Sequence, residues 1–552
     1  MERQRGKILS RGIRAVMPQH HISLNNGLFL AVLFSGIFCV RPYINSDAWF
    51  MLACGRYVEE FGIPHADPLT FLPNIHLVMQ QSLFATFLWK LYSAFGLGGF
   101  HVYSYVSCFL IILAEVAVIW HVSEGNRDTT AAIVLPVGYF VGAAFATQRP
   151  WTLTLALLLL EVFLLERFRS SSPRWLPSAF FLVSVLCVNI ESAMWPMTIV
   201  FLLPYIADAA FRDRLSMFPK EDGWTLRRLG ILVFAVLVGG LLNPYGWEGM
   251  QYGLVTYGKP SVVEIITEMF PLRFSFISGN FFLLDAVMIA IFALVAFYAR
   301  HPVPLRLLLL AAGTAFMALL AARNIIFFAT FAPIGVAWAL KGWKREPHDS
   351  RLTLIVAAVL AVLLPASSYD VILESIEKAP AAACFYLAVP LAVAAISFRR
   401  SQLACIVFLV VFACSPILLS SAVRPSVDAG LEESVQTIKK DNQDAKILSD
   451  YVDAGYAEFH GLHCLFDARA EVFLKETSWQ KDFLKEHTDM VKGATYYKDY
   501  LDKYPEITHV LTHGENLLYV YLLHDPDYEL VYDSAGRFSS DEEEYRVFRK
   551  KS

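Results

Sequence analysis

The chain has 552 residues, of which 56% are hydrophobic and only 17% are charged. Because soluble domains carry about 25% charged residues, this composition indicates a polytopic membrane protein and argues against a soluble enzyme. The formal net charge of -4 lacks the basic excess of a nucleic-acid-binding protein, so we expect no nucleic-acid partner.

Apolar segments of roughly 20 residues, the length that spans a bilayer, recur along the chain. We count about thirteen such segments, which predicts a polytopic α-helical membrane protein. They are centred near residues 34, 110, 137, 158, 182, 202, 236, 290, 312, 332, 360, 389 and 411. No small-residue cleavage site follows the first segment, so we interpret it as a retained helix. The eight cysteines are scattered and form no CxxC motif, which favours buried side chains over a disulfide or metal framework.

Lysine and arginine are unevenly divided between the loops. They are frequent in the basic segment 1–24 and in every second loop after it, and sparse in the loops between. The positive-inside rule therefore predicts a cytoplasmic N-terminus in a cell (cytoplasmic or inner) membrane. A transmembrane domain over 25–423 then leaves residues 424–552 on the extracytoplasmic side.

The first outer loop, 44–80, directly follows the first predicted span and carries two aspartates, Asp47 and Asp67. The stretch "DAWFMLACGRYVEEFG" after Ser46 predicts a short helix. The next apolar stretch, 82–96, contains Lys90 and is too short to span, so we expect an interfacial helix, with a re-entrant segment as the alternative.

Further polar residues fall at the outer ends of later spans. "TQRPW" places Arg149 there, and "VNIESAMW", "LLNPYGWEGM" and "AARNIIFF" place others at three more outer turns. The outer loop 244–280 adds acidic residues. The candidate cavity or acceptor-contacting residues are Gln81, Asn189, Glu191, Asn243, Tyr245, Glu268 and Asn324, and Arg323 joins Arg149 as a candidate anion ligand.

Each of these residues also has a structural explanation. Asp47 could cap its helix, and Asp67 before Pro68 could only mark a turn. Arg149 and Arg323 could extend to lipid headgroups, and the two asparagines could cap helix ends. These residues all fall on one side of the predicted membrane domain, which favours a shared site. The two arginines favour a phosphate as its ligand, because arginine donates two parallel hydrogen bonds to a phosphate.

The last segment, 424–552, has a different composition. Stretches such as "DAKILSDYVDAGYAEFHGLHCLFDARAEVF" alternate short strand and helix patterns, and "EEYRVFRK" reads as a closing strand. We therefore predict a small extracytoplasmic α/β domain. It could cap the cavity or dock an acceptor glycan.

These motifs resemble the GT-C superfamily of integral-membrane glycosyltransferases. The first-loop pattern "SDAWFMLACGRYVEEFGIPHADPLTF" is the most specific part, and "QRPW", "NPYGW", "ARN" and "SDYVDAGYAEF" are similar to motifs of an uncharacterised bacterial branch. The chain departs from the usual patterns at Trp49-Phe50, at Gln81-Ser82 and at Asn189-Ile190-Glu191.

The resemblance implies a polyprenyl-phosphate- or diphosphate-linked sugar donor and an extracytoplasmic acceptor, which is a glycan, lipid or protein. Asp47 would be the catalytic base of an inverting transfer, and Asp67 a second carboxylate that positions the acceptor or binds a metal. Arg149 and Arg323 would hold the donor phosphate. No metal site is specified, although Mg²⁺ or Mn²⁺ is compatible with the resemblance.

Two other functions stay open at this point. A flippase for lipid-linked sugars would share the anion site but needs polar groups through the whole membrane depth, whereas charged residues inside the predicted spans are few. A non-catalytic binding or assembly subunit would explain the departures from the usual motifs. Replacing Asp47 by asparagine separates these functions, because only a transferase loses turnover.

Overall fold

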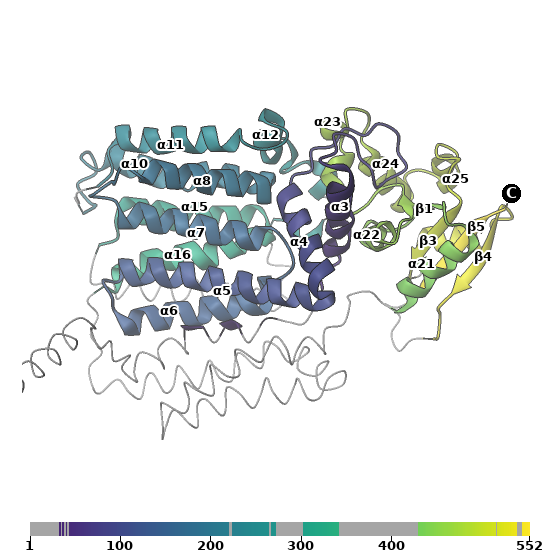
Figure 1. Ribbon diagram of the computed structural model, residues 1–552, viewed down its shortest axis with the longest axis horizontal. Helices are drawn as coiled ribbons and strands as arrows, with labels where there is room; N and C mark the ends of the chain where they lie inside the picture. Colours follow the sequence, from purple (N-terminus) through teal and green to yellow (C-terminus); the bar gives the residue numbers. More distant parts are fainter. Residues whose placement is uncertain are drawn as a thin grey trace, which may run out of the picture.

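The computed structural model describes residues 33–34, 36–37, 40, 44–219, 223–263, 266–271, 302–341, 429–514, 516–537 and 544–551. The spans predicted near residues 290, 360, 389 and 411 lie outside these ranges, and most of the span near residue 34 does too. Within the described part, the chain forms a helical bundle at one end and a mixed sheet at the other, with a pair of short helices between them (Figure 1).

The bundle helices run side by side in the long direction of the molecule (Figure 1). They are α5 (Leu97–Val122), α6 (Arg127–Phe140), α7 (Trp151–Arg167), α8 (Leu176–Ile190), α9 (Pro196–Val200), α10 (Leu203–Phe211), α11 (Leu226–Gly240), α15 (Leu305–Leu320) and α16 (Ile325–Ala339). Among the described residues, three helical stretches are long and apolar enough to cross a membrane: Leu97–Val122, Ser192–Phe211 and Ala322–Ala339. Leu176–Ile190 and Leu305–Leu320 are shorter apolar helices.

Several bundle helices change geometry where they approach the end next to α3 and α4 (Figure 1). α6 contains Pro136 and continues into a π-helical turn, η2 (Val141–Phe145). The 3₁₀ turns η3 (Ser192–Met194) and η6 (Ala322–Asn324) join α8 to α9 and α15 to α16. Such irregular turns leave backbone groups and polar side chains outside the regular helix ladder, and this is where the candidate site residues lie.

Two short helices, α3 (Asp47–Phe61) and α4 (Ser82–Phe95), pack against each other across this end of the bundle (Figure 1). A Cβ atom at Gly55 would come within 2.1 Å of the Ala85 carbonyl oxygen, so glycine permits their close approach. Leu83, Phe87 and Phe95 on α4 are exposed. An exposed apolar face on a short helix supports the predicted interfacial position of 82–96.

The outer loop that follows α11 is also partly helical. It contains α12 (Trp247–Thr256), α13 (Pro260–Val263) and the 3₁₀ turn η4 (Thr267–Met269). The backbone N–H of Ala322 donates to the Phe270 carbonyl oxygen at 2.9 Å, which ties this loop to the η6 turn.

The C-terminal residues form a five-stranded sheet in the order β2-β1-β3-β5-β4. β1 (Lys446–Leu448) pairs in parallel with β2 (His463–Cys464) and β3 (His509–His513), whereas β5 (Tyr545–Lys550) runs antiparallel to β3 and β4 (Tyr528–Asp533). The surrounding helices are α21 (Ala429–Asp441), α22 (Tyr451–Phe459), α23 (Lys475–Ser478), α24 (Phe483–Val491), α25 (Tyr497–Leu501) and α26 (Leu517–Leu523), with the 3₁₀ turn η8 (Ala470–Phe473) before α23.

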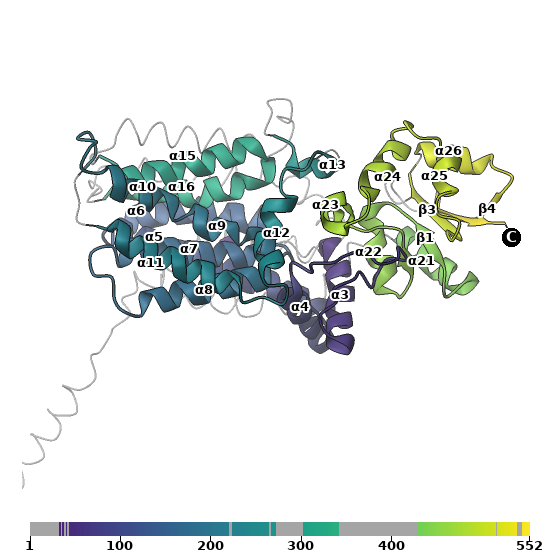
Figure 2. The same ribbon diagram turned by 90° about the horizontal axis from the view of Figure 1, so that it is seen from above.

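One hydrophobic core joins this sheet region to the first outer loop. Buried side chains of α3 and α4 belong to the same cluster as those of β1, β3 and β5. Helix α22 lies against α3 (Figure 2), with a Trp49–Tyr456 ring distance of 5.1 Å. A Cβ atom at Gly455 would lie 3.1 Å from the Phe50 nitrogen, so the two backbones nearly touch. The C-terminal region is therefore packed at the same end of the bundle as α3 and α4.

Candidate functional site

Asp47 is the first residue of α3, and its carboxylate is not used to cap that helix. Ser46 occupies the N-cap position without a side-chain cap, and the Asn45 side-chain oxygen accepts a hydrogen bond from the Asp47 backbone N–H at 3.0 Å. The carboxylate instead meets Arg149, with an Asp47 Oδ2–Arg149 Nη2 distance of 2.9 Å. The cap-only interpretation of Asp47 is therefore not what the structure shows.

Arg149 lies in the turn between η2 and α7 and joins two acidic residues. Its Nη1 atom is 3.0 Å from Glu268 Oε1, and its Nε atom donates to Asn45 Oδ1 at 3.4 Å. Gln148 supports this turn, because its Oε1 atom accepts from the Asn45 N–H at 2.9 Å and its Nε2 atom donates to Ser104 Oγ at 2.8 Å. The Arg149 guanidinium group thus joins three segments: the first outer loop, the η2–α7 turn and the loop that contains η4.

This ion-pair group remains partly open to solvent. The side chains of Asp47, Arg149 and Glu268 are 26%, 27% and 42% exposed. Burial raises the pKa of Asp47 above its usual value, although Arg149 opposes the shift. A carboxylate with a raised pKa is a better proton acceptor, and partial exposure leaves it accessible to a substrate hydroxyl.

Two more acidic side chains and one arginine complete the charged group. Glu191, between α8 and η3, accepts a hydrogen bond from Thr154 Oγ1 at 3.4 Å, and burial raises the pKa of Glu191 to about 7 against the opposing charge of Arg323. Burial also raises the pKa of Glu471, which lies in η8 of the C-terminal region. The positive charge of Arg323 opposes the rise in the pKa of Asp47, Glu191 and Glu471, so it lies within electrostatic range of each of them.

The turn that carries Arg323 is fixed through its neighbour. Asn324 Nδ2 donates to the Tyr257 hydroxyl at 2.7 Å and to the Met317 carbonyl oxygen at 3.0 Å. Arg323 is the middle residue of this turn, and no carboxylate of the described residues forms an ion pair with it.

The other predicted residues mainly hold the turns together. Asn189 Nδ2 donates to the Val185 and Leu242 carbonyl oxygens, both at 2.8 Å, and Asn243 Nδ2 donates within its own turn. The Tyr245 hydroxyl donates to the Pro64 carbonyl oxygen at 2.7 Å. Gln81 is buried at the N-terminus of α4. These contacts match the structural explanation for the two asparagines.

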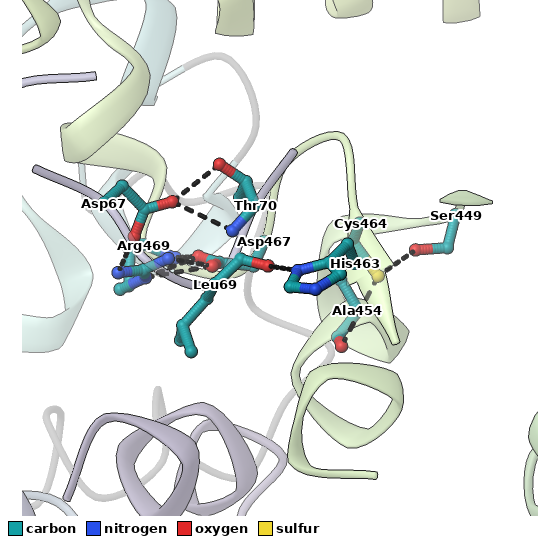
Figure 3. Close-up of polar contacts among 9 residues, drawn as sticks. All are labelled: Asp67, Leu69, Thr70, Ser449, Ala454, His463, Cys464, Asp467 and Arg469. Carbon is teal, nitrogen blue, oxygen red and sulfur yellow. Dashed lines mark hydrogen bonds and ion pairs between the residues drawn. The ribbon is translucent and has the colours of Figure 1, made fainter. Parts of the chain in front are cut away.

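Asp67 lies in a different environment from Asp47. Its Oδ1 atom is 2.7 Å from Arg469 Nη1, and its Oδ2 atom accepts hydrogen bonds from Thr70 Oγ1 at 2.6 Å and the Thr70 N–H at 3.1 Å (Figure 3). Arg469 also pairs with Asp467. Burial alone would raise the pKa of Asp67, but Arg469 and Thr70 outweigh burial and lower it.

The same junction includes main-chain contacts. His463 Nδ1 lies 2.9 Å from the Leu69 carbonyl oxygen (Figure 3), and the Phe71 N–H donates to the Cys464 carbonyl oxygen at 3.2 Å. The Asp67 side chain is 0% exposed and the Arg469 side chain is 5% exposed. This buried ion pair attaches the first outer loop to the C-terminal region. An acceptor could not reach the Asp67 carboxylate.

Sequence reasoning missed three side chains of the C-terminal region, Asp467, Arg469 and Glu471. The segment "LFDARAEVF" contained the signal, since it placed two acidic residues and an arginine within five positions. Glu471 bonds to the Gln80 side chain, and the Gln80 carbonyl oxygen accepts from the Ser192 N–H at 2.8 Å. The C-terminal region therefore reaches the Glu191 turn through the first outer loop.

The carboxylates are not arranged as a metal-binding set. Among the residues that the structure describes, no three His, Cys, Asp or Glu side chains are grouped so that they could hold a metal ion. Asp47 and Glu268 are instead directed at Arg149. The four cysteines in the described ranges, Cys54, Cys108, Cys187 and Cys464, are free and buried, as predicted.

No family model matches the chain, and neither does any curated protein sequence. Solved structures do match. ArnT from Cupriavidus metallidurans bound to undecaprenyl phosphate aligns at 12% identity over 96% of this chain and 98% of ArnT, with a TM-score of 0.51. The apo state of the same ArnT aligns at 14% identity over 94% of this chain and 96% of ArnT, with a TM-score of 0.50.

A second protein with a similar structure is the archaeal oligosaccharyltransferase AglB from Archaeoglobus fulgidus, in complex with an inhibitory peptide and a dolichol-phosphate. It aligns at 10% identity over 88% of this chain and 69% of AglB, with a TM-score of 0.50. Both proteins have the GT-C fold, and both were solved with a polyprenyl phosphate bound. The chain is thus a membrane protein with the GT-C fold, as its sequence motifs predicted.

Proposed function

Starting from the GT-C fold, we propose that the protein transfers a sugar from a polyprenyl-phosphate- or diphosphate-linked donor to an extracytoplasmic acceptor, with inversion at the anomeric carbon. The observation that carries this proposal is the Asp47–Arg149 pair, in which a partly exposed carboxylate of raised pKa lies 2.9 Å from a guanidinium group. A base and a phosphate ligand are thereby side by side. The acceptor is a glycan, a lipid or a protein.

In the proposed reaction, Asp47 accepts the proton of the acceptor hydroxyl. The hydroxyl oxygen forms a bond to the anomeric carbon from the face opposite the phosphate. The bond between that carbon and the phosphate oxygen breaks, and the phosphate leaves with the electron pair. General-base assistance of this kind contributes about 10²–10⁴-fold to the rate.

Arg149 and Arg323 would stabilise the departing phosphate. Because Arg149 is paired with both Asp47 and Glu268, a phosphate oxygen would have to replace Glu268, the more exposed of the two carboxylates. This exchange costs little, since the Glu268 side chain is 42% exposed and surface ion pairs contribute about 0–1 kcal/mol. Arg149 would then hold the phosphate while Asp47 stays beside it as the base.

We propose the following placement in the membrane. The polyprenyl chain lies in the bilayer beside about thirteen transmembrane helices, the N-terminus is cytoplasmic, and residues 424–552 are extracytoplasmic. The charged group at the outer helix ends then faces the compartment that holds the acceptor. This placement predicts that a cysteine introduced at exposed Asp502 reacts with an impermeant thiol reagent in intact cells.

The direct test is sugar transfer by the purified protein in lipid, with radiolabelled polyprenyl-phosphate donors and candidate acceptors. The proposal expects product from the wild type and loss of turnover, with donor binding retained, from Asp47→Asn. Glu60→Gln, an exposed residue of the same helix, is the matched control. Equal turnover of wild type and Asp47→Asn would favour a different base, and lipid-sugar binding without any transfer would favour the flippase or assembly function.

The same assay tests the metal. Mg²⁺ and Mn²⁺ are each added after treatment with EDTA. Because Asp47 and Glu268 are paired with Arg149 and, among the described residues, no three His, Cys, Asp or Glu side chains are grouped to hold a metal ion, we expect transfer to continue in EDTA.

A further inference from the structure

The first turn of α22 lies beside the first turn of α3, the turn that begins with Asp47. A Cβ atom at Gly455 would lie 3.1 Å from the Phe50 nitrogen. Further along both helices, Arg56 Cζ lies 5.4 Å from the ring centre of Phe459. Because these two contacts advance in the same direction, α22 and α3 run side by side with their N-terminal ends together.

Tyr451 is the first residue of α22. It precedes Gly455 by four positions, and residues four apart lie on the same face of a helix. Tyr451 is therefore on the face of α22 that packs on α3, one turn nearer to Asp47. Asp450 fixes this turn, because its side chain caps α22 by accepting a hydrogen bond from the Val452 N–H at 3.4 Å.

The charged groups that act on Tyr451 agree with this position. Burial raises the pKa of the Tyr451 hydroxyl, and the carboxylates of Asp450, Asp47 and Glu268 raise it further. The positive charge of Arg149 opposes the rise. The C-terminal region thus brings a phenol group within electrostatic range of the Asp47–Arg149 pair.

The Tyr451 hydroxyl is available to a ligand. Its side chain is partly exposed, and in the described part of the chain the hydroxyl forms no hydrogen bond. Other tyrosines at this end of the protein are already engaged, since the Tyr245 hydroxyl donates to the Pro64 carbonyl oxygen at 2.7 Å. A phenol hydroxyl can donate one hydrogen bond and accept others, which suits a partner that is itself a hydroxyl group.

The proposed reaction determines which part of the substrate such a group would meet. The acceptor oxygen lies at Asp47 and the leaving phosphate at Arg149, so the anomeric carbon lies between them. A side chain within range of both residues therefore faces the transferred sugar and not the polyprenyl chain.

We propose that the Tyr451 hydroxyl forms a hydrogen bond with a hydroxyl group of the transferred sugar and so contributes to the choice of donor. The inference rests on the proposed function, because it takes the sugar to lie between Asp47 and Arg149. A site that hydrogen-bonds a substrate hydroxyl discriminates against analogues that lack it. Tyr451 would make the C-terminal region part of the donor site.

The test measures lipid binding to the full-length protein in nanodiscs. The ligands are polyprenyl phosphate without a sugar and polyprenyl phosphate linked to each of several hexoses and pentoses. Tyr451→Phe removes only the hydroxyl, so we expect it to weaken binding of the preferred sugar-linked lipid about three- to tenfold. The Kd for polyprenyl phosphate should stay unchanged.

Two comparisons separate a sugar contact from a structural role. Tyr496→Phe, which alters an exposed tyrosine of the same region, is the matched control and should bind every lipid as the wild type does. A donor that lacks the contacted sugar hydroxyl should bind equally to the wild type and Tyr451→Phe, because the hydrogen bond is then absent from both complexes. Melting temperatures check that each variant is folded.

Four results would overturn the proposal: no sugar-linked lipid binds to the wild type, Tyr451→Phe binds all of them equally well, it loses affinity equally with and without the sugar, or its loss persists with every deoxy donor. If the loss is specific to the sugar but the wild type transfers none, the Tyr451 proposal stands and the transferase proposal fails. If transfer occurs and Tyr451→Phe keeps the wild-type donor Kd and KM, the Tyr451 proposal fails alone.

Discussion

Asp47 and Asp67 come from the same outer loop, and each pairs with one arginine, but their surroundings differ. The Asp47–Arg149 pair is about a quarter exposed, and the pKa of Asp47 is raised by burial. The Asp67–Arg469 pair is enclosed, and arginine and threonine partners lower the pKa of Asp67 despite its burial. The same ion-pair chemistry can thus serve exchange with a ligand in one place and permanent attachment in the other.

The largest expected effect on the transfer rate comes from replacing Asp47, the proposed catalytic base. Asp47→Asn should lower the transfer rate by about 10²–10⁴-fold, because the amide cannot accept the acceptor's proton at neutral pH. Its melting temperature should fall less than that of an Asp67 variant, because the Asp47–Arg149 pair is partly exposed and Arg149 keeps Glu268 as a partner. A large loss of stability with an unchanged rate would reverse the roles of the two aspartates.

Asp67→Ala tests the opposite assignment. Removing one partner of a buried ion pair costs about 3–5 kcal/mol, because Arg469 keeps only Asp467 and Thr70 loses its acceptor. We expect a markedly lower melting temperature and faster proteolysis of the C-terminal region. Asp502→Ala, on the surface of that region, is the control and should have little effect. Wild-type stability of Asp67→Ala would show that the junction depends on apolar packing alone.

Glu191 is a buried carboxylate without an arginine partner. It is buried, as Asp67 is, but no arginine in the described part of the chain lies within 4 Å of it. Its pKa of about 7 lies above the usual 4.5, so the folded protein holds a proton that the unfolded chain releases. Stability should therefore fall as pH rises from about 4.5 to 7, by up to about 3 kcal/mol. Glu191→Gln should flatten this part of the melting-temperature profile. An equally steep decline in the variant would assign the pH dependence to other groups.

Arg149→Lys keeps the positive charge but removes the two-pronged contact. We expect donor binding to weaken roughly tenfold, which corresponds to about 1.4 kcal/mol, because lysine presents a single ammonium group to the phosphate. The measurement is the Kd for a polyprenyl phosphate in lipid nanodiscs. An unchanged Kd would indicate that Arg323 alone holds the phosphate.

Glu268→Gln has the smallest expected effect and the opposite sign. It removes the carboxylate that competes with phosphate for Arg149, so polyprenyl phosphate should bind up to about fivefold more tightly, within the 0–1 kcal/mol of an exposed pair. The gain should shrink at high salt, which screens the competing charge in the wild type. Weaker binding in the variant would mean that Glu268 supports the ligand directly.

The residues that the structure brings together at the candidate site have a simple feature in common. Asp47, Arg149, Glu191 and Arg323 each follow or precede an apolar span, so the span count alone predicted that they lie at the same end of the bundle. Charge and span length are local properties of the sequence, and no pairing between distant residues was needed. The resemblance to GT-C motifs added the fold, which the structural comparisons support.

The partners of Asp67 could not be predicted in the same way. Arg469 lies in the C-terminal region, and nothing in the local pattern at residue 67 indicates which distant arginine reaches it. The burial of the Asp67–Arg469 pair follows from the shared apolar core of α3, α4 and the sheet. This core is a tertiary property that a single sequence does not reveal. The same reason applies to Glu471 and its contact with Gln80.

The close approach of α22 to α3 has a consequence for how the protein is made. Helix α3 is synthesised near the start of translation, whereas α22 and Gly455 emerge only after the membrane domain has been inserted. The apolar face of α3 that packs on α22 therefore stays uncovered until the last fifth or so of the chain has been synthesised and has folded against it. Chains interrupted before that point would expose Trp49 and Phe50. We expect quality-control proteases to degrade such chains.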